Sequence, residues 1–158
     1  MTHPTHVLRP LVEADILQVL DLYRAAILPI WLERGRDHDF GRIEANLRAR
    51  IGDGDHGLTV AQGASGHRAP LAGYLAWERH PDHTSTHTVA HLRMILVHPD
   101  HQGSGLGRDL MRHFEAAARA AGCTKLLFDV LAGSPARGFY ERLGYHHWSD
   151  YLEKRLDG

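Results

Sequence analysis

The sequence predicts a single domain of the mixed α/β class, and three observations support that prediction. The chain has 158 residues, which suits one domain, and 43% of them are hydrophobic, which is enough for one core. Segments that alternate like strands lie between segments with the periodicity of helices. A glycine-rich turn separates a strand-like run at 92–97 from an amphipathic run at 108–121. Because no linker, repeat or low-complexity tract interrupts the chain, we expect one domain over residues 1–158.

The first two thirds of the chain are expected to form most of a sheet. A helix at 13–27 places its apolar residues on one side, and Pro29 is expected to end it, since proline lacks the N–H that a helix interior needs. The segment 80–87 is expected to be an exposed hairpin loop. In chain order, the expected elements are a strand at 7–10, helices at 13–27 and 40–51, and strands at 58–62, 71–79 and 88–98.

The last third of the chain alternates between helix and strand. Ser134 suits an N-cap, and Pro135 suits the first turn of a helix, where its missing N–H is not needed. Gly144 is expected to end that helix. In chain order, the expected elements are a helix at 108–121, a buried strand at 125–131, a helix that starts near Ser134 and a final strand at 145–156.

Charge and composition exclude several classes of function. The net charge is −1, so no basic surface for nucleic acid is expected. No apolar run is long enough to span a bilayer, and the first residues lack the apolar core of a signal peptide. Cys123 is the only cysteine, which rules out an internal disulfide and fits a reducing cytoplasm. We therefore expect a cytoplasmic protein with no nucleic-acid or membrane partner.

The chain contains 14 histidines, an unusual number. His80 and His83, like His98 and His101, have a spacing at which two ligands of a metal ion can meet. Both pairs lie in loops with proline and aspartate, and neither has a cysteine or a clear third ligand nearby. We therefore interpret them as solvated histidines and expect no metal.

The run Gln-Gly-Ser-Gly-Leu-Gly at 102–107 predicts a phosphate site. Glycines let the backbone approach an anion closely, and the first amides of the following helix have no intrahelical partner. A nucleoside-triphosphatase loop would need a lysine after the glycines, and none follows. A dinucleotide fingerprint that starts at Gly103 would need a third glycine where Arg108 stands. What remains is Gln-x-x-Gly-x-Gly between a strand and a helix.

A second motif starts at Ala136, where the chain reads Ala-x-x-Phe-Tyr-Glu-x-Leu-Gly-Tyr. Together, the two motifs resemble the acyl-CoA pyrophosphate loop and the last helix of the GNAT superfamily of N-acetyltransferases. The order of the expected elements resembles that fold as well, so the resemblance covers essentially the whole chain. It implies a mixed, mostly antiparallel sheet of six to seven strands, flanked by about four helices, with two strands splayed at the acyl-CoA site.

The resemblance implies that acetyl-CoA is the donor substrate. Its pantetheine arm would contact the backbone of the strand before the loop, and the loop amides would bind its pyrophosphate, with Gln102 bracing the loop. Many members contact the ligand through an asparagine at the position of Gly133, so this contact is missing here or passes to Ser134. The expected donor-binding residues are Ile95, Leu96, Val97, Gln102, Gly103, Ser104, Gly105, Leu106, Gly107, Arg108, Ser134, Ala136 and Phe139.

Three residues are candidates for catalysis. Tyr140 matches the tyrosine that protonates the departing CoA thiolate in many members, and pKa values of about 8.5 for a thiol and about 10 for a phenol make that transfer feasible. The acceptor amine must also lose a proton. Histone acetyltransferases of the superfamily carry a glutamate at the position of His91, where a histidine could act as the base or simply face solvent. Glu78 on the neighbouring strand is the second candidate base, and a chain of water molecules is the third.

The resemblance places the acceptor site largely in the segment 28–40 and the hairpin loop. Trp31 and Phe40 could form a wall and the acidic residues between them could attract a cation, although a solvated loop explains them equally well. The favoured hypothesis is acetyl transfer to a small primary amine. Transfer to a protein N-terminus or lysine, and a non-catalytic acyl-CoA sensor, are the alternatives. The sequence does not decide between a monomer and a homodimer that forms through the last strands.

Overall fold

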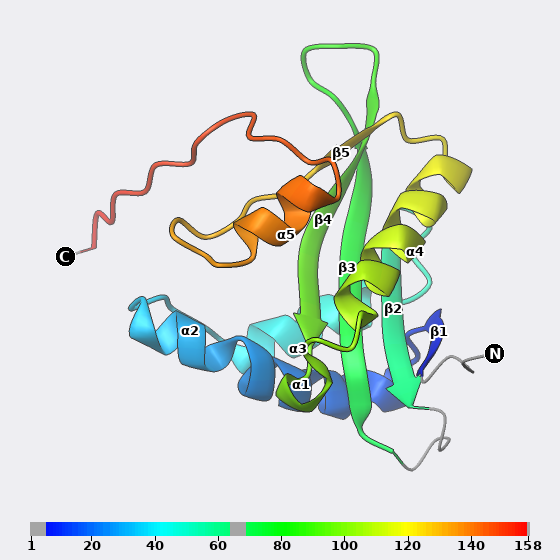
Figure 1. Cartoon of the computed structure of the whole chain (residues 1–158), viewed down its shortest axis with the longest axis vertical. Helices are drawn as coiled ribbons and strands as arrows, with labels where there is room; N and C mark the ends of the chain where they lie inside the picture. Colours follow the sequence, from blue (N-terminus) through cyan, green and yellow to red (C-terminus); the bar gives the residue numbers. More distant parts are fainter. Residues whose placement is uncertain (1–5, 64–68, 158) are drawn as a thin grey trace. The chain divides into compact units, whose positions relative to one another are not determined.

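The computed structural model describes residues 6–63 and 69–157, and the chain divides into two compact units, 1–128 and 129–158. All strands of the described residues lie in the first unit, where they form one sheet in the order β1-β2-β3-β4-β5 (Figure 1). The elements of this unit are β1 (His6–Pro10), the 3₁₀ turn η1 (Glu13–Asp15), α1 (Ile16–Ala26), α2 (Leu28–Glu33), α3 (Phe40–Arg50), β2 (His56–Gly63), β3 (Leu71–Pro81), β4 (Thr88–Val97), the 3₁₀ turn η2 (Pro99–His101), α4 (Leu106–Ala120) and β5 (Lys125–Leu127).

The sheet is mixed and mostly antiparallel. Each of the first four strands runs antiparallel to its neighbour, whereas β5 runs parallel to β4. A parallel neighbour needs a crossover connection, and α4 supplies it. The predicted fold class is therefore confirmed. The predicted number of strands, six to seven, is too high, because the described residues form five.

Helices cover both faces of the sheet. Tyr74 in β3 belongs to a buried cluster with α1 to α3, and its ring centroid lies 6.0 Å from that of Tyr23 in α1. The preceding residue, Gly73, faces α4, where an added Cβ would lie 3.1 Å from Leu110 Cδ1. Because successive residues of a strand point to opposite faces, α4 lies on the face opposite α1. Burial of one large apolar side chain contributes about 1.5–3 kcal/mol, so both layers stabilise the sheet.

The segment after α1 differs from the prediction. The helix expected at 13–27 is present as η1 and α1 and ends at Ala26, before Pro29 as predicted, but Pro29 lies in the first turn of a further helix, α2, that was not predicted. Its missing N–H costs nothing there, because the first amides of a helix have no intrahelical partner. α2 buries Trp31, whose ring centroid lies 5.9 Å from that of Tyr23. The helices expected at 40–51 and 108–121 are confirmed as α3 and α4.

Over its described residues, 129–157, the second unit contains one short helix, α5 (Arg137–Arg142). Ser134 does not cap this helix as expected, since its Oγ accepts a hydrogen bond from Ala136 N at 3.2 Å in the preceding turn and Ala136 is the N-cap. Gly144 follows the helix, as predicted, with a φ of 92° that favours glycine.

The final strand expected at 145–156 does not form, and the strand expected at 125–131 is limited to β5. The apolar and aromatic residues of the last segment are Tyr145, Trp148, Tyr151, Leu152 and Leu156. Their spacing does not have the period of two that would give a strand one apolar face. Leu152 and Leu156 are 97% and 87% exposed.

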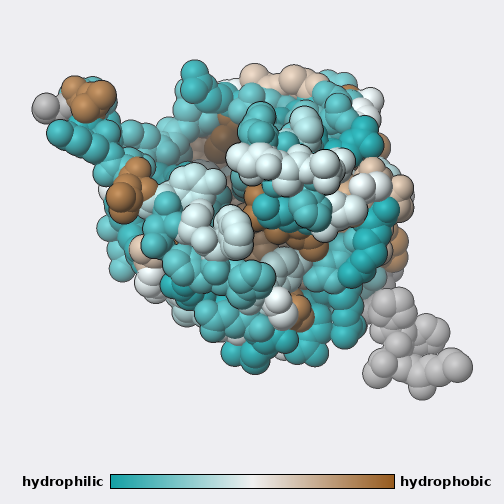
Figure 2. All heavy atoms as spheres, turned by 90° about the horizontal axis from the view of Figure 1, so that it is seen from above, coloured by the Kyte–Doolittle hydropathy of each residue, from teal (hydrophilic) through white to brown (hydrophobic). Residues whose placement is uncertain are grey.

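Figure 2 shows one face on which hydrophilic residues dominate and hydrophobic residues form separate patches. None of the helices in the ranges 6–63 and 69–157 combines the length and the apolar character needed to cross a membrane.

Candidate active site

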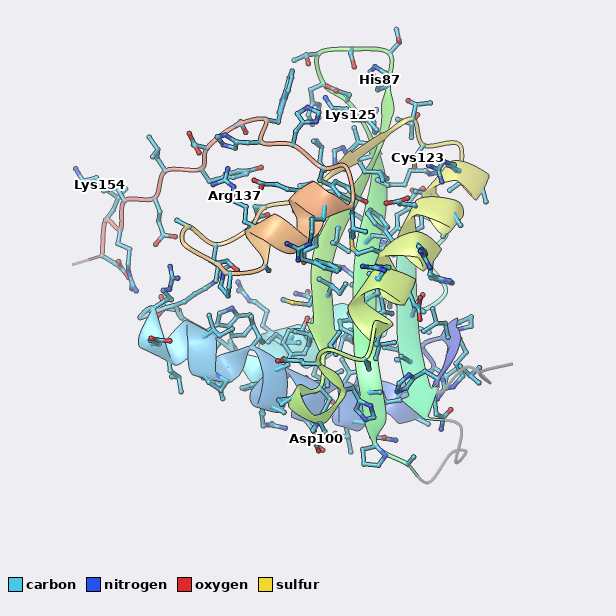
Figure 3. The ribbon with its side chains drawn as sticks, in the orientation of Figure 1. His87, Asp100, Cys123, Lys125, Arg137 and Lys154 are labelled. Atoms are coloured by element: carbon cyan, nitrogen blue, oxygen red, sulfur yellow. The ribbon has the colours of Figure 1, made fainter. Side chains whose placement is uncertain are left out.

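The glycine-rich loop lies between β4 and α4, as predicted. η2 leads into it, and Figure 3 shows Asp100 of η2 at the opposite end of β4 from His87 and the β3–β4 hairpin. Gly103 and Gly105 have φ values of 78° and 88°, which residues with a side chain rarely adopt. Glycine at these two positions lets the chain turn sharply into α4.

The N-terminus of α4 presents backbone N–H groups without an intrahelical partner. Its N-cap is Gly105, and no side-chain hydrogen bond caps it within the described residues. The first intrahelical bond runs from Asp109 N to Gly105 O, at 3.1 Å. The amides of Leu106, Gly107 and Arg108 therefore point out of the helix end, where they and the helix dipole favour an anion.

Gln102 and Ser104 turn toward the backbone of the loop. Gln102 Nε2 lies 3.5 Å from Val97 O, at the end of β4. Ser104 donates to His101 O twice, from its backbone N at 3.3 Å and from Oγ at 2.5 Å. These contacts leave the amides of α4 as the main donors for a ligand.

The C-terminal half of β4 has an open edge. β5 pairs with β4 only at positions 89–91. His98 N donates to β3 at 2.8 Å, and backbone groups alternate in direction along a strand, so Leu96 also bonds toward β3. The N–H and C=O groups of Ile95 and Val97 point the other way, where no strand of the described residues meets them. Three residues of β4 were expected to contact the ligand through their backbone. Of these, Ile95 and Val97 thus lie on the open edge, whereas Leu96 bonds toward β3.

A β-bulge brings a guanidinium beside Glu78. The register of β3 and β4 shifts between Ala76 and Trp77, so Arg93 in β4 has no residue directly opposite. Arg93 Nη2 donates to Glu78 Oε1, and His56 Nε2 lies 3.6 Å from Glu78 Oε2. The hydrogen bond from Arg93 lowers the pKa of Glu78 below its ordinary value. Glu78 is therefore a weaker base than an exposed glutamate.

The two candidate bases, Glu78 and His91, lie directly opposite each other in β3 and β4. His91 Nε2 lies 3.5 Å from Arg93 Nη1, at the outer limit of a hydrogen bond. The ring centroid of His91 lies 5.8 Å from that of His80. His80 was not predicted for this site, although its two-residue spacing from Glu78 places both side chains on one face of β3.

In each histidine pair of the loops, the two imidazole rings lie close together. The rings of His80 and His83 stack with their centroids 6.4 Å apart, and the centroids of His98 and His101 are 6.1 Å apart. Throughout residues 6–63 and 69–157, no group of three or more histidine, cysteine, aspartate and glutamate side chains is arranged to hold a metal ion.

Tyr140 lies in α5, and the expected donor contacts Ser134, Ala136 and Phe139 lie in the same unit. The Tyr140 ring centroid is 5.1 Å from that of Phe139 and 6.4 Å from that of Tyr145, and both contacts are edge-on. Burial raises the pKa of Tyr140 above its ordinary value, so the phenol keeps its proton at neutral pH. The protonated phenol is the form that a general acid needs.

Arginine side chains lie over the rings of Trp31 in α2 and Phe40 at the start of α3. Arg24 Cζ lies 4.5 Å from the ring centroid of Phe40, and Arg36 Cζ lies 5.9 Å from that of Trp31. Asp39, one of the acidic residues of this segment, accepts a hydrogen bond from the first turn of α3 at 3.0 Å and caps that helix. The expected aromatic wall therefore carries two guanidinium groups.

The model of the acetyltransferase (GNAT) family matches residues 17–145 of the chain. The chain belongs to this family. The match confirms the family predicted from the glycine-rich loop and the motif around Tyr140, and it includes residues of both units.

Proteins similar to this member of the family include enzymes named for small-molecule substrates. Streptothricin acetyltransferase of Streptomyces lavendulae is 35% identical over 110 residues, which are 68% of this chain and 53% of that protein. Glucosamine 6-phosphate N-acetyltransferase of Trypanosoma brucei brucei is 33% identical over 69 residues, 44% of either chain. The chain thus spans about half the length of the curated relatives it matches. An aminoglycoside antibiotic 6'-N-acetyltransferase from Acinetobacter baumannii shares the fold, with a TM-score of 0.74 at 20% identity over 96% of this chain and 99% of that one.

Proposed function

We propose that this protein is an N-acetyltransferase that transfers the acetyl group of acetyl-CoA to a primary amine of a small molecule. The observation that carries the proposal is the open edge of β4, which leads through η2 and the glycine-rich loop to a helix N-terminus without a side-chain cap. Membership of the acetyltransferase family supports it. The names of the similar proteins, which refer to streptothricin, glucosamine 6-phosphate and aminoglycosides, support a small acceptor.

The proposed donor site has a phosphate end and a pantetheine end. The amides at the start of α4 and in the loop would bind the pyrophosphate, and the open edge of β4 would pair with the pantetheine arm. Because the family match includes residues of both units, we treat residues 1–158 as one functional domain. The proposed donor contacts are Ile95, Val97, Gly103, Gly105, Leu106, Gly107, Arg108, Ser134, Ala136 and Phe139.

In the proposed reaction, the amine nitrogen attacks the acetyl carbonyl carbon, a C–N bond forms and the C–S bond breaks. We assign the removal of the amine proton to His91 rather than Glu78, because Arg93 donates a close hydrogen bond to the Glu78 carboxylate and lowers its pKa, whereas its contact with His91 Nε2 is 3.5 Å long. Tyr140 would protonate the departing thiolate, since its raised pKa keeps the phenol protonated. Proton exchange with solvent then restores the neutral His91 and the Tyr140 phenol, and the products are the amide and the CoA thiol.

Thiol release from acetyl-CoA, measured with a panel of acceptors, tests this function. The panel contains an aminoglycoside, streptothricin, glucosamine 6-phosphate, a lysine-containing peptide and a peptide with a free N-terminus. We expect turnover with at least one of the three small amines and none with the peptides. Turnover with a peptide alone would contradict the small acceptor. Saturable CoA binding without turnover on any amine would contradict catalysis and favour an acyl-CoA sensor.

A further inference from the structure

A hydrogen bond between two histidines joins the first strand to the glycine-rich loop. His6 Nε2 in β1 lies 3.1 Å from His101 Nδ1 at the end of η2, although 95 residues separate them in the chain. Their ring centroids are 4.9 Å apart, with the planes at 79°. In the sheet, β2 and β3 lie between β1 and β4, so this contact joins β1 to the turn that follows a strand with which β1 does not pair.

The backbone of His101 organises the loop. Its carbonyl oxygen accepts both hydrogen bonds of Ser104, and its N–H donates to His98 O at 2.8 Å. Gly103 and Gly105, whose left-handed conformations turn the chain into α4, follow within four residues. A contact that holds the His101 ring in place therefore also restricts where the α4 amides lie.

The contact requires that one of the two facing nitrogens lacks a proton, because a neutral imidazole has one donor and one acceptor nitrogen. Burial is the largest influence on His6 and lowers its pKa, and His101 lowers it further, whereas Asp109 on α4 acts in the opposite direction. The ring centroid of His98 also lies 6.1 Å from that of His101, and the Asp100 carboxylate lies 3.6 Å from His98 Nδ1.

We propose that His6 is a positioning residue for the donor, and that its hydrogen bond with His101 holds the glycine-rich loop in the conformation that presents the α4 amides to a phosphorylated ligand. The inference rests on the proposed function for the identity of that ligand, CoA. His6 acts through the loop, so its removal changes donor affinity and leaves the rate of the saturated enzyme unchanged.

Isothermal titration calorimetry of the full chain with CoA tests the proposal in four proteins. These are the wild type, His6→Ala, His6→Gln and a control, His146→Ala, which removes an exposed histidine of the second unit. We expect His6→Ala to raise the Kd for CoA about fivefold, the size expected for one lost hydrogen bond. We expect His6→Gln to stay within about twofold of the wild type, because an amide both donates and accepts. With acetyl-CoA varied, the KM for the donor rises in His6→Ala while kcat does not change.

Several outcomes would overturn the inference. If folded His6→Ala binds CoA with the wild-type Kd, His6 does not position the loop. If His6→Ala and His6→Gln lose the same affinity for CoA, the imidazole ring matters and its hydrogen bond does not. Should His6→Ala not fold, His6→Asn replaces it, since its shorter side chain does not reach His101, and an unchanged Kd there has the same meaning. If the wild type itself does not bind CoA, the proposed function fails together with the inference.

Discussion

Gly57 in β2 lies directly opposite Trp77 in β3, and the indole ring occupies the space that a side chain at position 57 would need. A Cβ at that position would lie 2.0 Å from Trp77 Nε1. Trp77 is 7% exposed, and its ring centroid lies 5.8 Å from that of Phe114 in α4. The ring therefore has little room to move, and this pair connects β2 to the helix that begins at the glycine-rich loop.

Replacing Gly57 by alanine should destabilise the protein. The added methyl group forces Trp77 off its site, and overpacking of this kind costs about 1–3 kcal/mol. We expect the thermal midpoint to fall by about 3–10 °C. Gly54→Ala is the matched control, because a Cβ there meets nothing within 4 Å. Equal thermal midpoints for the two variants would show that Trp77 relaxes without cost.

Removing the guanidinium beside Glu78 should raise the pKa of that carboxyl group. In Arg93→Ala, the hydrogen bond that is the main cause of the lowered pKa is lost. Titration of the glutamate side-chain carbons by NMR measures the change. Arg112→Ala, which removes an exposed arginine of α4, is the control. An unchanged pKa of Glu78 in Arg93→Ala would mean that His56 or the strand backbone stabilises the carboxylate instead.

The ion pair at the β3–β4 hairpin should make stability depend on pH in the acid range. The pKa of Asp82 is held well below its ordinary value, first by the hydrogen bond from Thr84 N–H and second by Lys125, whose Nζ lies 3.1 Å from Asp82 Oδ2. A carboxyl group with a lowered folded-state pKa stabilises the protein above its unfolded pKa of about 3.9, and this contribution is lost as the pH falls further. The difference in unfolding free energy between the wild type and Asp82→Asn should therefore be larger at pH 7 than at pH 3. Urea unfolding at both pH values measures it, and a constant difference would contradict the role of the charge.

Substituting Tyr140 by phenylalanine should slow acetyl transfer and spare donor binding. The ring contacts with Phe139 and Tyr145 do not need the hydroxyl group, so we expect CoA affinity within about twofold of the wild type. Loss of a general acid lowers kcat by about 100-fold or more. Steady-state rates across the pH range provide the measurement, and a variant with full activity at every pH would exclude Tyr140 from the mechanism.

The parts of the site with local signals could be predicted from the sequence. The turn at Gly103 and Gly105 and the helix after it depend on residues within a few positions of one another. Glu78 and His91 could both be assigned to neighbouring strands of one hairpin, whereas their direct pairing is a matter of register that the structure supplies. Short-range chemistry, such as left-handed glycines and helix periodicity, decides these features.

Other features depend on contacts that no local pattern contains. The bulge at Arg93 changes the register by one residue, and only the pairing of the two strands reveals it. The contact of His6 with His101 joins distant segments of the chain. Pro29 fits both the end of one helix and the start of the next, so its presence alone could not predict α2.

The short pairing of β5 has a consequence for handling the protein. An unpaired strand edge offers its N–H and C=O groups to any other chain, and such edges promote aggregation. Within the described residues, Ile95 and Val97 form an edge of this kind where β4 extends beyond β5. A molecule that covers this edge would act as a solubilising cap as well as a reactant, so precipitation during concentration should depend on whether that edge is occupied.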